Sequence, residues 1–325
     1  MKLDRRTFLT ASLGLAAGAS TTALLNRPRY HVSRKVPRSR VAILTAESYS
    51  HNLENVLYCG LELFHLDLRG KTVLLKPNLV DYIPGNHINT HPLLVAAAVE
   101  CLRRLGAKNV LVGEGPGHQR DTELVLLESG FREELRQLKV PFVDLNRDEL
   151  VMTPLLATYT GMKRLWLSRT VLEADFVVSM PKVKTHHWSG VTLSMKNMFG
   201  VVPGAKYGWP KNILHWKGIQ ESILDVCATV PVHFVIADAI VAMEGNGPLN
   251  GIRGRSTKLS SPMIRLRRMP PVRGLWDLTR PGSRTFESER SFWATPLSSE
   301  STRLQRWSAG QPILLRWCRN LSTYA

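Results

Sequence analysis

The strongest constraint on the fold is a set of apolar runs that lack polar alternation and are separated by helical patterns. The runs are "RVAILTA" from residue 40, "TVLL" from 72, "NVLV" from 109, "FVDL" from 142, "FVVSM" from 176 and "HFVIA" from 233. Runs of this kind are typical of strands that are buried on both faces. Interleaved with amphipathic helices, they predict an α/β fold with a mostly parallel sheet and helices on both faces.

Helix signals lie between these runs. From Leu94, apolar side chains recur at i+4, i+7 and i+11, with Pro92 suited to the first turn and Gly106 placed to end the helix. A second helix is predicted with Asp121 as its N-cap and Gly130 as its stop. A third is predicted over residues 216–230, before the last strand run.

Polar residues follow several of the predicted strands. In open parallel sheets, ligands bind beyond the carboxyl ends of the strands. The residues that would meet there are Lys76 with Asn78, Lys182 with Lys184, and Lys196 with Asn197. Lysine charges and amide donors at one edge suit a phosphate, a carboxylate or another anion. The alternative for each lysine is a solvated surface charge, and their shared placement is what favours a site.

Oxygen and nitrogen ligands in the same region raise the possibility of a metal. Glu114, Asp238 and Glu244 carry hard oxygen ligands that suit magnesium or calcium. His186, His187 and His215 could bind a transition metal or shuttle protons. The alternatives are a turn cap for Asp238 and ordinary core or surface positions for the histidines. A divalent metal is therefore an open expectation.

The four cysteines are far apart in the sequence and include no C-x-x-C pair. This spacing excludes a zinc ribbon and an iron–sulfur ligand run in this chain. We expect the cysteines to be small buried hydrophobic residues.

The N-terminus has the pattern of an export signal. Residues 1–26 begin with a short basic region that contains Arg5 and Arg6, and residues 7–25 carry no charge. The stretch "DRRTFL" is similar to the twin-arginine export motif. We therefore expect an exported protein, periplasmic or on the outer face of the cytoplasmic membrane, which uses the twin-arginine machinery. Its membrane contact would come only through an uncleaved signal. Residues 27–40 would form a linker.

The positive charge of the chain is concentrated at its C-terminus. Residues 252–325 contain fourteen Lys and Arg but only four Asp and Glu, which supplies +10 of the net charge of +17. A basic nucleic-acid binder acting through this tail is one function that such a charge suggests. The body, residues 41–251, is only mildly basic. Nucleic acid is therefore an unfavoured partner.

Six motifs, in order, resemble those of the domain-of-unknown-function family numbered 362. They are "VLLKPNLV", "NTHPLLVAAAVECLRRLGAKNVLVGEGPG", "ADFVVSMPKVKTH", "VTLSMKNMFGVVPG", "HWKGIQESILDV" and "IADAIVAMEGNGPLNG", within about residues 41–251. The resemblance implies an α/β fold but no established activity. Some members carry ferredoxin-type iron–sulfur modules, which implies a redox partner as an alternative. The positions that match family motifs are Lys76, Asn78, Lys182, Lys184, Thr185, His186, Lys196, Asn197, Gly200, His215, Asp238, Glu244, Gly247 and Pro248.

After residue 251 the chain departs from the family pattern. The family continues into a strand and a motif that resembles "DDPVAxDA", whereas this chain becomes rich in arginine, serine, proline and tryptophan. Residues 256–280 can be back-translated, with suitable choices among degenerate codons, so that the neighbouring frame reads the family motif. We therefore hypothesise a frameshift near residues 253–256 and expect an irregular basic tail over 252–325. The alternative is a basic extension specific to this lineage.

These observations favour an exported protein that binds or transforms an anionic small molecule at a Lys/Asn/Asp-rich strand-end site. The alternatives left open are an accessory protein that works with an iron–sulfur partner and a nucleic-acid binder.

Overall fold

The computed structural model describes residues 39–268, apart from 51, 118–120, 210 and 255–262. They form a ten-stranded sheet with the path β1 (Val41–Thr45), β12 (Met263–Arg268), β10 (Phe234–Asn246), β7 (Phe176–Met180), β2 (Thr72–Pro77), β3 (Asn109–Glu114) and β4 (Phe142–Asp144). Three further strands join it off this path: β8 (Lys182–His186), β9 (Gly190–Thr192) and β11 (Asn250–Arg253). A separate hairpin pairs β5 (Leu150–Pro154) with β6 (Arg164–Ser168).

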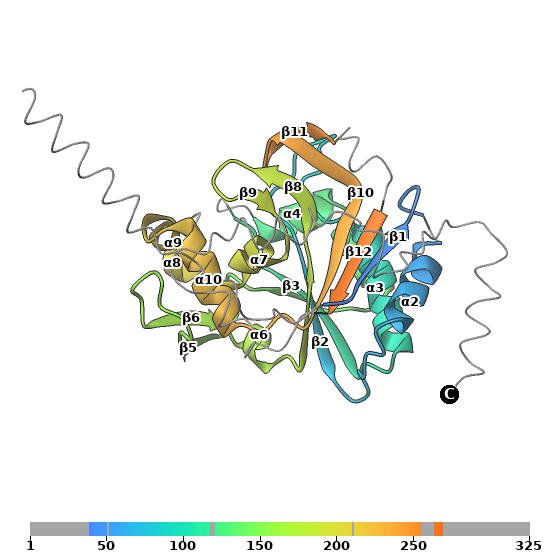
Figure 1. Ribbon diagram of the computed structural model, residues 1–325, viewed down its shortest axis with the longest axis horizontal. Coiled ribbons are helices and arrows are strands. Elements are labelled where there is room, and N and C mark those ends of the chain that lie inside the picture. The colour runs from blue at the N-terminus through green and yellow to red at the C-terminus, as the bar shows by residue number, and fades with distance from the viewer. Residues whose placement is uncertain (1–38, 51, 118–120, 210, 255–262, 269–325) are drawn as a thin grey trace, which may run out of the picture. The chain divides into compact units, whose positions relative to one another are not determined.

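The central strands are parallel, as the apolar runs predict. β10, β7, β2, β3 and β4 pair in parallel, whereas β12 is antiparallel to both β10 and β1. The predicted mostly parallel α/β sheet is therefore confirmed. The hairpins β8–β9 and β10–β11 lie together at the top of Figure 1, beyond the carboxyl ends of the parallel strands.

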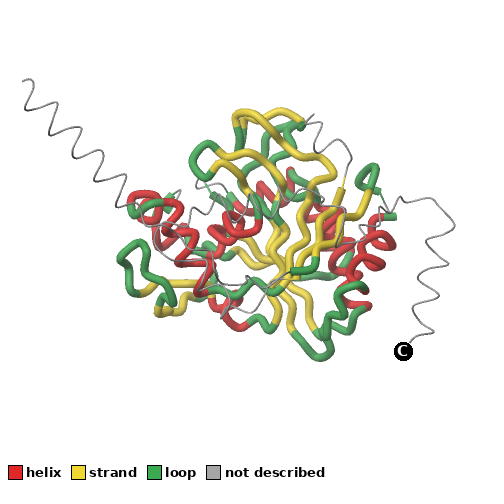
Figure 2. Tube along the Cα trace, in the orientation of Figure 1, coloured by secondary structure: helices red, strands yellow, loops and turns green. Residues whose placement is uncertain are grey.

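Helices cover both faces of the sheet (Figure 2). One face packs against α2 (Leu53–Glu62), α3 (Pro92–Arg104), α4 (Thr122–Glu128) and α5 (Phe131–Gln137). The other packs against α6 (Arg169–Glu173), η1 (Met198–Val201), α9 (Asn212–Trp216), α10 (Ile219–Thr229) and β6. Short helices α7 (Ser194–Asn197) and α8 (Gly204–Tyr207) lie beside η1 in the sequence.

Successive residues of β2 enter different cores. Val73 and Leu75 belong to the core under α2–α5, whereas Leu74 belongs to the core under α10. All three side chains are fully buried. The period of two along a strand explains this division, and burial on both faces explains why the run shows no polar alternation.

Two of the three predicted helices have the boundaries that the structure shows. The third, predicted over residues 216–230, begins later, because Trp216 ends α9 and α10 spans Ile219–Thr229. Pro92 is the first residue of α3. Gly106 lies just beyond the end of the helix and adopts a φ of +92°, which residues other than glycine rarely adopt. Asp121 caps α4 by accepting a hydrogen bond from the N–H of Leu124 at 3.1 Å.

Part of the expectation for residues 252–325 is wrong. β11 extends to Arg253, and residues 263–268 form β12 inside the sheet. Ile264 and Leu266 are fully buried and Arg267 between β1 and β10 is half-buried, so the apolar pair two residues apart marks a strand that the surrounding arginine and proline residues obscure in the sequence. Residues 255–262 and 269–325 lie outside the described residues, and the frameshift stays a prediction.

The predicted export signal also falls outside the described part of the chain, because residues 1–38 are not described. Within the residues that are described, no helix has the length and apolar character needed to cross a membrane.

The place of β12 in the sheet can be tested at Leu266. A Cβ added at Gly60 of α2 would lie 2.8 Å from Leu266 Cδ1, so this side chain packs directly on the helix. We expect Leu266→Ala to lower the free energy of unfolding by about 2–5 kcal/mol in urea titrations. Arg268→Ala, on the same strand but exposed, is the control and should change it little. Equal stability of both variants and the parent would place β12 outside the folded body and favour the frameshift.

Candidate functional site

The predicted strand-end residues lie where the order of the sheet changes direction. The chain runs outward from β2 to β3 and β4, and later places β7 on the opposite side of β2. Such a switch point is where open α/β sheets bind ligands. Lys76 lies at the end of β2, and Lys182 begins β8, just after β7.

Lys76 and Glu114 form an ion pair that is removed from solvent. Lys76 Nζ lies 2.5 Å from Glu114 Oε2, and the two side chains are 0% and 2% exposed. Glu114 also accepts hydrogen bonds from the backbone N–H groups of Leu79 at 3.2 Å and Gly115 at 2.8 Å. Two buried charges are tolerated only with such additional hydrogen bonds. The pair therefore fixes the ends of β2 and β3 relative to each other.

Asn197 supports this pair. Its Oδ1 accepts from Lys76 Nζ at 3.1 Å, and its Nδ2 donates to Lys76 O and Ser179 Oγ, both at 3.0 Å. The neighbouring backbone at Gly200 passes so close that an added Cβ would lie 2.7 Å from Lys76 Nζ. Asn197 thus positions Lys76, and residue 200 has no room for a side chain.

A second buried ion pair joins Lys182 to Asp238. The two residues are paired in register across β8 and β10, and Lys182 Nζ lies 3.0 Å from Asp238 Oδ2. Tyr49 donates its hydroxyl hydrogen to Asp238 Oδ1 at 2.7 Å and accepts from Lys182 Nζ at 2.8 Å. The N–H of His91 donates to Asp238 Oδ2 at 3.0 Å. Tyr49 and His91 stack with ring centroids 3.8 Å apart, which completes the network.

The sequence did not reveal Tyr49 or His91 as members of this network. Burial and the nearby Asp238 raise the pKa of Tyr49 well above its usual range, and burial lowers the pKa of His91 to about 4. Both side chains are therefore neutral at pH 7.

Lys184 and Lys211 are equally buried, yet backbone carbonyls hold their amines. Lys184 Nζ donates to Ile88 O at 2.6 Å, and Lys211 Nζ donates to Phe199 O at 3.1 Å and Gly115 O at 3.3 Å. Among the described residues, neither amine has a carboxylate within ion-pairing distance.

The pKa values of both amines are low. Burial, with Lys196 and Lys182 nearby, holds the pKa of Lys184 well below its usual range. Burial lowers the pKa of Lys211 to about 7. Lys211, which the sequence did not reveal, also adopts a left-handed backbone with φ of +73°. Left-handed conformations of residues other than glycine are strained and concentrate at functional sites.

Asn78 contributes a polar atom with no partner. Its side chain is 7% exposed, and its Oδ1 is buried without a hydrogen-bond partner. Its backbone is held by Thr90, which accepts from the Asn78 N–H at 2.9 Å and donates to Met180 O at 2.6 Å. Asn78 bonds Thr90, and Lys184 bonds Ile88 O. Both residues therefore contact the same loop, which lies between β2 and α3. A buried amide oxygen without a donor is a position that a ligand can complete.

The remaining predicted anion ligands lie at the edge of this cluster. Lys196 is half-buried, with its Nζ 4.5 Å from the Phe199 ring centroid. Burial first, and the charge of Lys196 second, lower the pKa of His186 to about 3. Thr185 instead donates to Gly245 O at 2.9 Å, so it ties β8 to the β10–β11 hairpin.

The four residues expected to bind a metal do not converge. Glu114 and Asp238 are each engaged by a buried lysine. Glu244 lies opposite Ile252 in the β10–β11 hairpin, and His215 lies in α9 beside Phe199 and Trp188. Within the described ranges, no group of three His, Cys, Asp or Glu could hold a metal ion. We therefore derive no metal chemistry from these residues.

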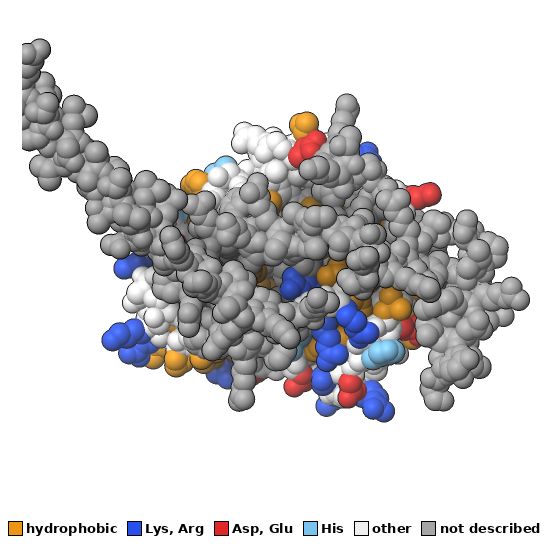
Figure 3. Space-filling view, viewed as in Figure 1, with side chains coloured by type: hydrophobic (Ala, Val, Ile, Leu, Met, Phe, Trp, Pro, Cys, Tyr) orange, Lys and Arg blue, Asp and Glu red, His pale blue; other side chains and the backbone are white. Residues whose placement is uncertain are grey.

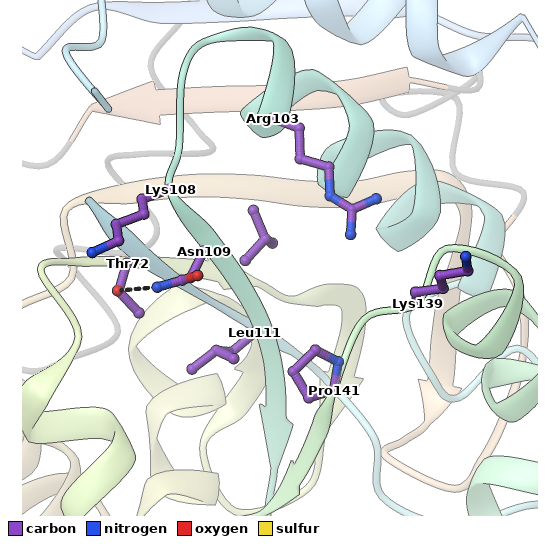
Figure 4. Close-up of a pocket in the computed structure, with 8 residues that line it drawn as sticks. Thr72, Arg103, Lys108, Asn109, Leu111, Lys139 and Pro141 are labelled. Atoms are coloured by element: carbon purple, nitrogen blue, oxygen red, sulfur yellow. Dashed lines mark hydrogen bonds between the residues drawn. The ribbon is translucent and has the colours of Figure 1, made fainter. Parts of the chain in front are cut away.

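A separate basic hollow lies at the opposite end of β2 and β3. This cavity of about 250 Å³ is lined by Thr72 and Asn109, at the amino ends of the two strands, and by Arg103, Lys108 and Lys139 (Figure 4). Lys and Arg side chains also gather along the lower edge of the face in Figure 3. Since the amino end of the sheet is remote from the buried lysines, this hollow does not belong to the site.

Comparison with known proteins identifies relatives of the chain. Residues 73–259 match the family described as "Domain of unknown function (DUF362)". A protein of Synechocystis sp. described as thylakoid-associated is 30% identical over 191 residues, which are 56% of this chain and 56% of that protein. The chain thus spans about half the length of this curated relative.

Two solved structures are also similar, at low identity. One is a protein from Thermotoga maritima, with 12% identity and a TM-score of 0.35 over 65% of this chain and 55% of that one. The other is the lactate racemase apoprotein from Thermoanaerobacterium thermosaccharolyticum, with 14% identity and a TM-score of 0.42 over 68% of this chain and 56% of that one.

The low pKa of Lys211 predicts how the free energy of unfolding depends on pH. Above pH 7 the native amine is neutral, whereas an unfolded lysine keeps its proton to about pH 10.4. Unfolding therefore takes up a proton in this window, and the free energy of unfolding gains up to about 1.4 kcal/mol per pH unit as pH rises. We expect Lys211→Met to flatten this slope in urea titrations between pH 7 and 10.

Lys217→Met, an exposed lysine six residues later, is the matched control for Lys211→Met and should retain the parent slope. Parallel slopes for the parent and Lys211→Met would show that Lys211 carries its proton in the native state, against the expectation.

Proposed function

The chain belongs to the DUF362 family, and we propose that it binds an anionic small molecule at the carboxyl ends of β2 and β7 and acts on it there. Lys184 carries the anion, supported by Lys182, Lys196 and Asn78. Lys76 and Asn197 hold the ends of β2 and β3 in place around the site.

The observation that carries the proposal is the state of Lys184. Its amine is fully buried, and its described partner is one backbone carbonyl, at 2.6 Å. Burying a charged amine without a counter-charge costs free energy. Deprotonation removes the charge, but the amine still lacks the hydrogen bonds that it made to water. An anion beside Lys184 would supply the missing charge. A fold that retains such a lysine at its topological switch point is expected to use it.

The net charge of the lysine cluster also supports anion binding. Lys76, Lys182, Lys184, Lys196 and Lys211 face two buried carboxylates, Glu114 and Asp238. With all five amines protonated, the cluster would hold three more positive charges than negative ones. In a region of low dielectric constant this excess favours the binding of an anion.

Binding and protonation are coupled at this site. Because burial holds the pKa of Lys184 well below its usual range, its neutral form becomes populated at a lower pH than that of an exposed lysine. A bound anion raises that pKa by favouring the charged form. Binding therefore takes up a proton, and affinity falls as pH rises. The same lysine, when neutral, is a potential base or nucleophile toward the bound molecule.

Export is proposed on the N-terminal sequence alone. Arg5 and Arg6 precede nineteen residues without charge, a pattern typical of twin-arginine signals. We expect replacement of both arginines by lysine to retain the full chain in the cytoplasmic fraction of a host with this pathway, while the parent reaches the exported fraction. Equal distribution of parent and variant would contradict export by this route.

The anion site is tested with sulfate, whose charge does not change between pH 6 and 9. Calorimetry of the full chain should show binding that weakens as pH rises and a net uptake of protons. Lys184→Met should weaken sulfate binding about tenfold or more, since it removes a buried charge-assisted contact.

Lys108→Met is the matched control for Lys184→Met because it removes one lysine from the basic hollow at the other end of the sheet. It should leave sulfate binding unchanged. If Lys108→Met loses sulfate binding and Lys184→Met retains it, the anion binds in that hollow. If the parent binds none of the three anions sulfate, phosphate and acetate, the proposal is contradicted.

A further inference from the structure

A series of aromatic rings leads from the surface to the lysine cluster. Trp188 and His187, in the β8–β9 turn, have ring centroids 4.9 Å apart. Trp188 also lies 4.9 Å from His215 of α9, which lies 5.3 Å from Phe199 of η1. Three separate segments within residues 187–215 therefore bring their rings together next to β8.

The inner end of this series adjoins the proposed anion site. Lys196 Nζ lies 4.5 Å from the Phe199 centroid, and the pKa of His186 is lowered first by burial and then by nearby charges that include Lys196 and Lys184. His186 in turn stacks on His187, with centroids 5.0 Å apart. Lys196 thus adjoins the inner ring of the series, and the buried Lys184 is near enough to influence the same imidazole.

Hydrogen bonds hold two of the imidazoles in defined tautomers. His186 Nδ1 accepts from the N–H groups of Trp188 at 3.2 Å and Ser189 at 3.3 Å, so this ring is neutral and its proton is on Nε2. His187 Nδ1 lies 3.1 Å from Gly247 O, which can only accept, so His187 carries a proton on Nδ1. The turn that presents Trp188 is therefore anchored on both sides.

The outer end of the series remains open to solvent. Trp188 is 55% exposed although it contacts two other rings. A large aromatic side chain that is partly packed, exposed and next to a charged cluster is typical of a ligand site. Its rigid π-face suits a flat partner better than an aliphatic chain.

The neighbouring charges restrict the partner further. Aromatic faces also attract cations, but Lys196 and Lys184 would repel a cationic ligand. A neutral planar ring that carries an anionic group satisfies both parts of the surface.

We propose that the anion bound at this site carries a planar aromatic ring, which stacks on Trp188 while its phosphate or carboxylate reaches Lys196 and Lys184. This inference rests on the proposed anion site and names the class of ligand: aromatic or heteroaromatic phosphates and carboxylates.

The test compares anions that differ only in the ring. Phenyl phosphate is paired with methyl phosphate, and benzoate with acetate, by calorimetry and tryptophan fluorescence on the full chain at pH 7. We expect the ring-bearing member of at least one pair to bind about tenfold more tightly. We also expect it to quench tryptophan fluorescence, whereas the ringless member does not.

Two tryptophan variants locate the effect. Trp188→Ala should abolish the preference for the ring while the ringless anion still binds. Trp216→Ala removes a tryptophan that is 81% exposed at the end of α9, and it should retain the preference. Trp188→Phe keeps a ring at the position and should retain part of the preference, which provides a second variant if Trp188→Ala does not fold.

The outcomes separate the two proposals. Equal binding of ring-bearing and ringless anions by the parent would overturn the ring inference and leave the anion site standing. A ring preference that persists in Trp188→Ala would also overturn it. Absence of binding for all four probes would overturn both.

Discussion

Two charges buried side by side at the ends of β2 and β3 constrain the rest of the site. Removing Lys76 and Glu114 from water costs several kcal/mol per ion, and this is offset only where geometry and further hydrogen bonds are favourable. Asn197 and the backbone of the β2 and β3 ends supply those bonds. The carbonyls that hold Lys211 belong to Gly115, whose N–H donates to Glu114, and to Phe199, which precedes the Gly200 backbone packed beside the pair. The position of Lys211 therefore depends on the pair.

Lys184 and Lys211 reduce stability where they lie. A lysine without a buried counter-charge disfavours its own protonated form, and Lys211 adds a left-handed backbone conformation. A hydrophobic side chain at either position would avoid the penalty of burying an amine, whereas the left-handed backbone at residue 211 would stay strained for any residue other than glycine. Natural chains keep such features mainly where activity or binding requires them, because stability elsewhere can be improved without loss of function. The two lysines are therefore better explained by function than by folding.

Much of the fold follows from local patterns, but the partners within the site do not. The apolar run at Val73–Leu75 predicts a buried strand, and parallel strands bring Lys76 and Lys182 to one edge. Glu114 and Asp238 suggested metal ligands because the order of the strands was unknown. Once β8 lies beside β10, Lys182 is in register with Asp238.

Longer-range features left weaker signals in the sequence. Tyr49 reaches Asp238 across 189 residues, a separation that no local pattern encodes. Lys211 has no motif that marks it, although a lysine between Pro210 and a short helix with adjacent glycine and tryptophan is unusual. The two basic regions also differ physically: salt screens exposed charges in the hollow at the amino end of β2, whereas buried amines near Lys184 are screened far less. Raising the ionic strength therefore weakens the electrostatic field of the hollow much more than that of the buried lysines.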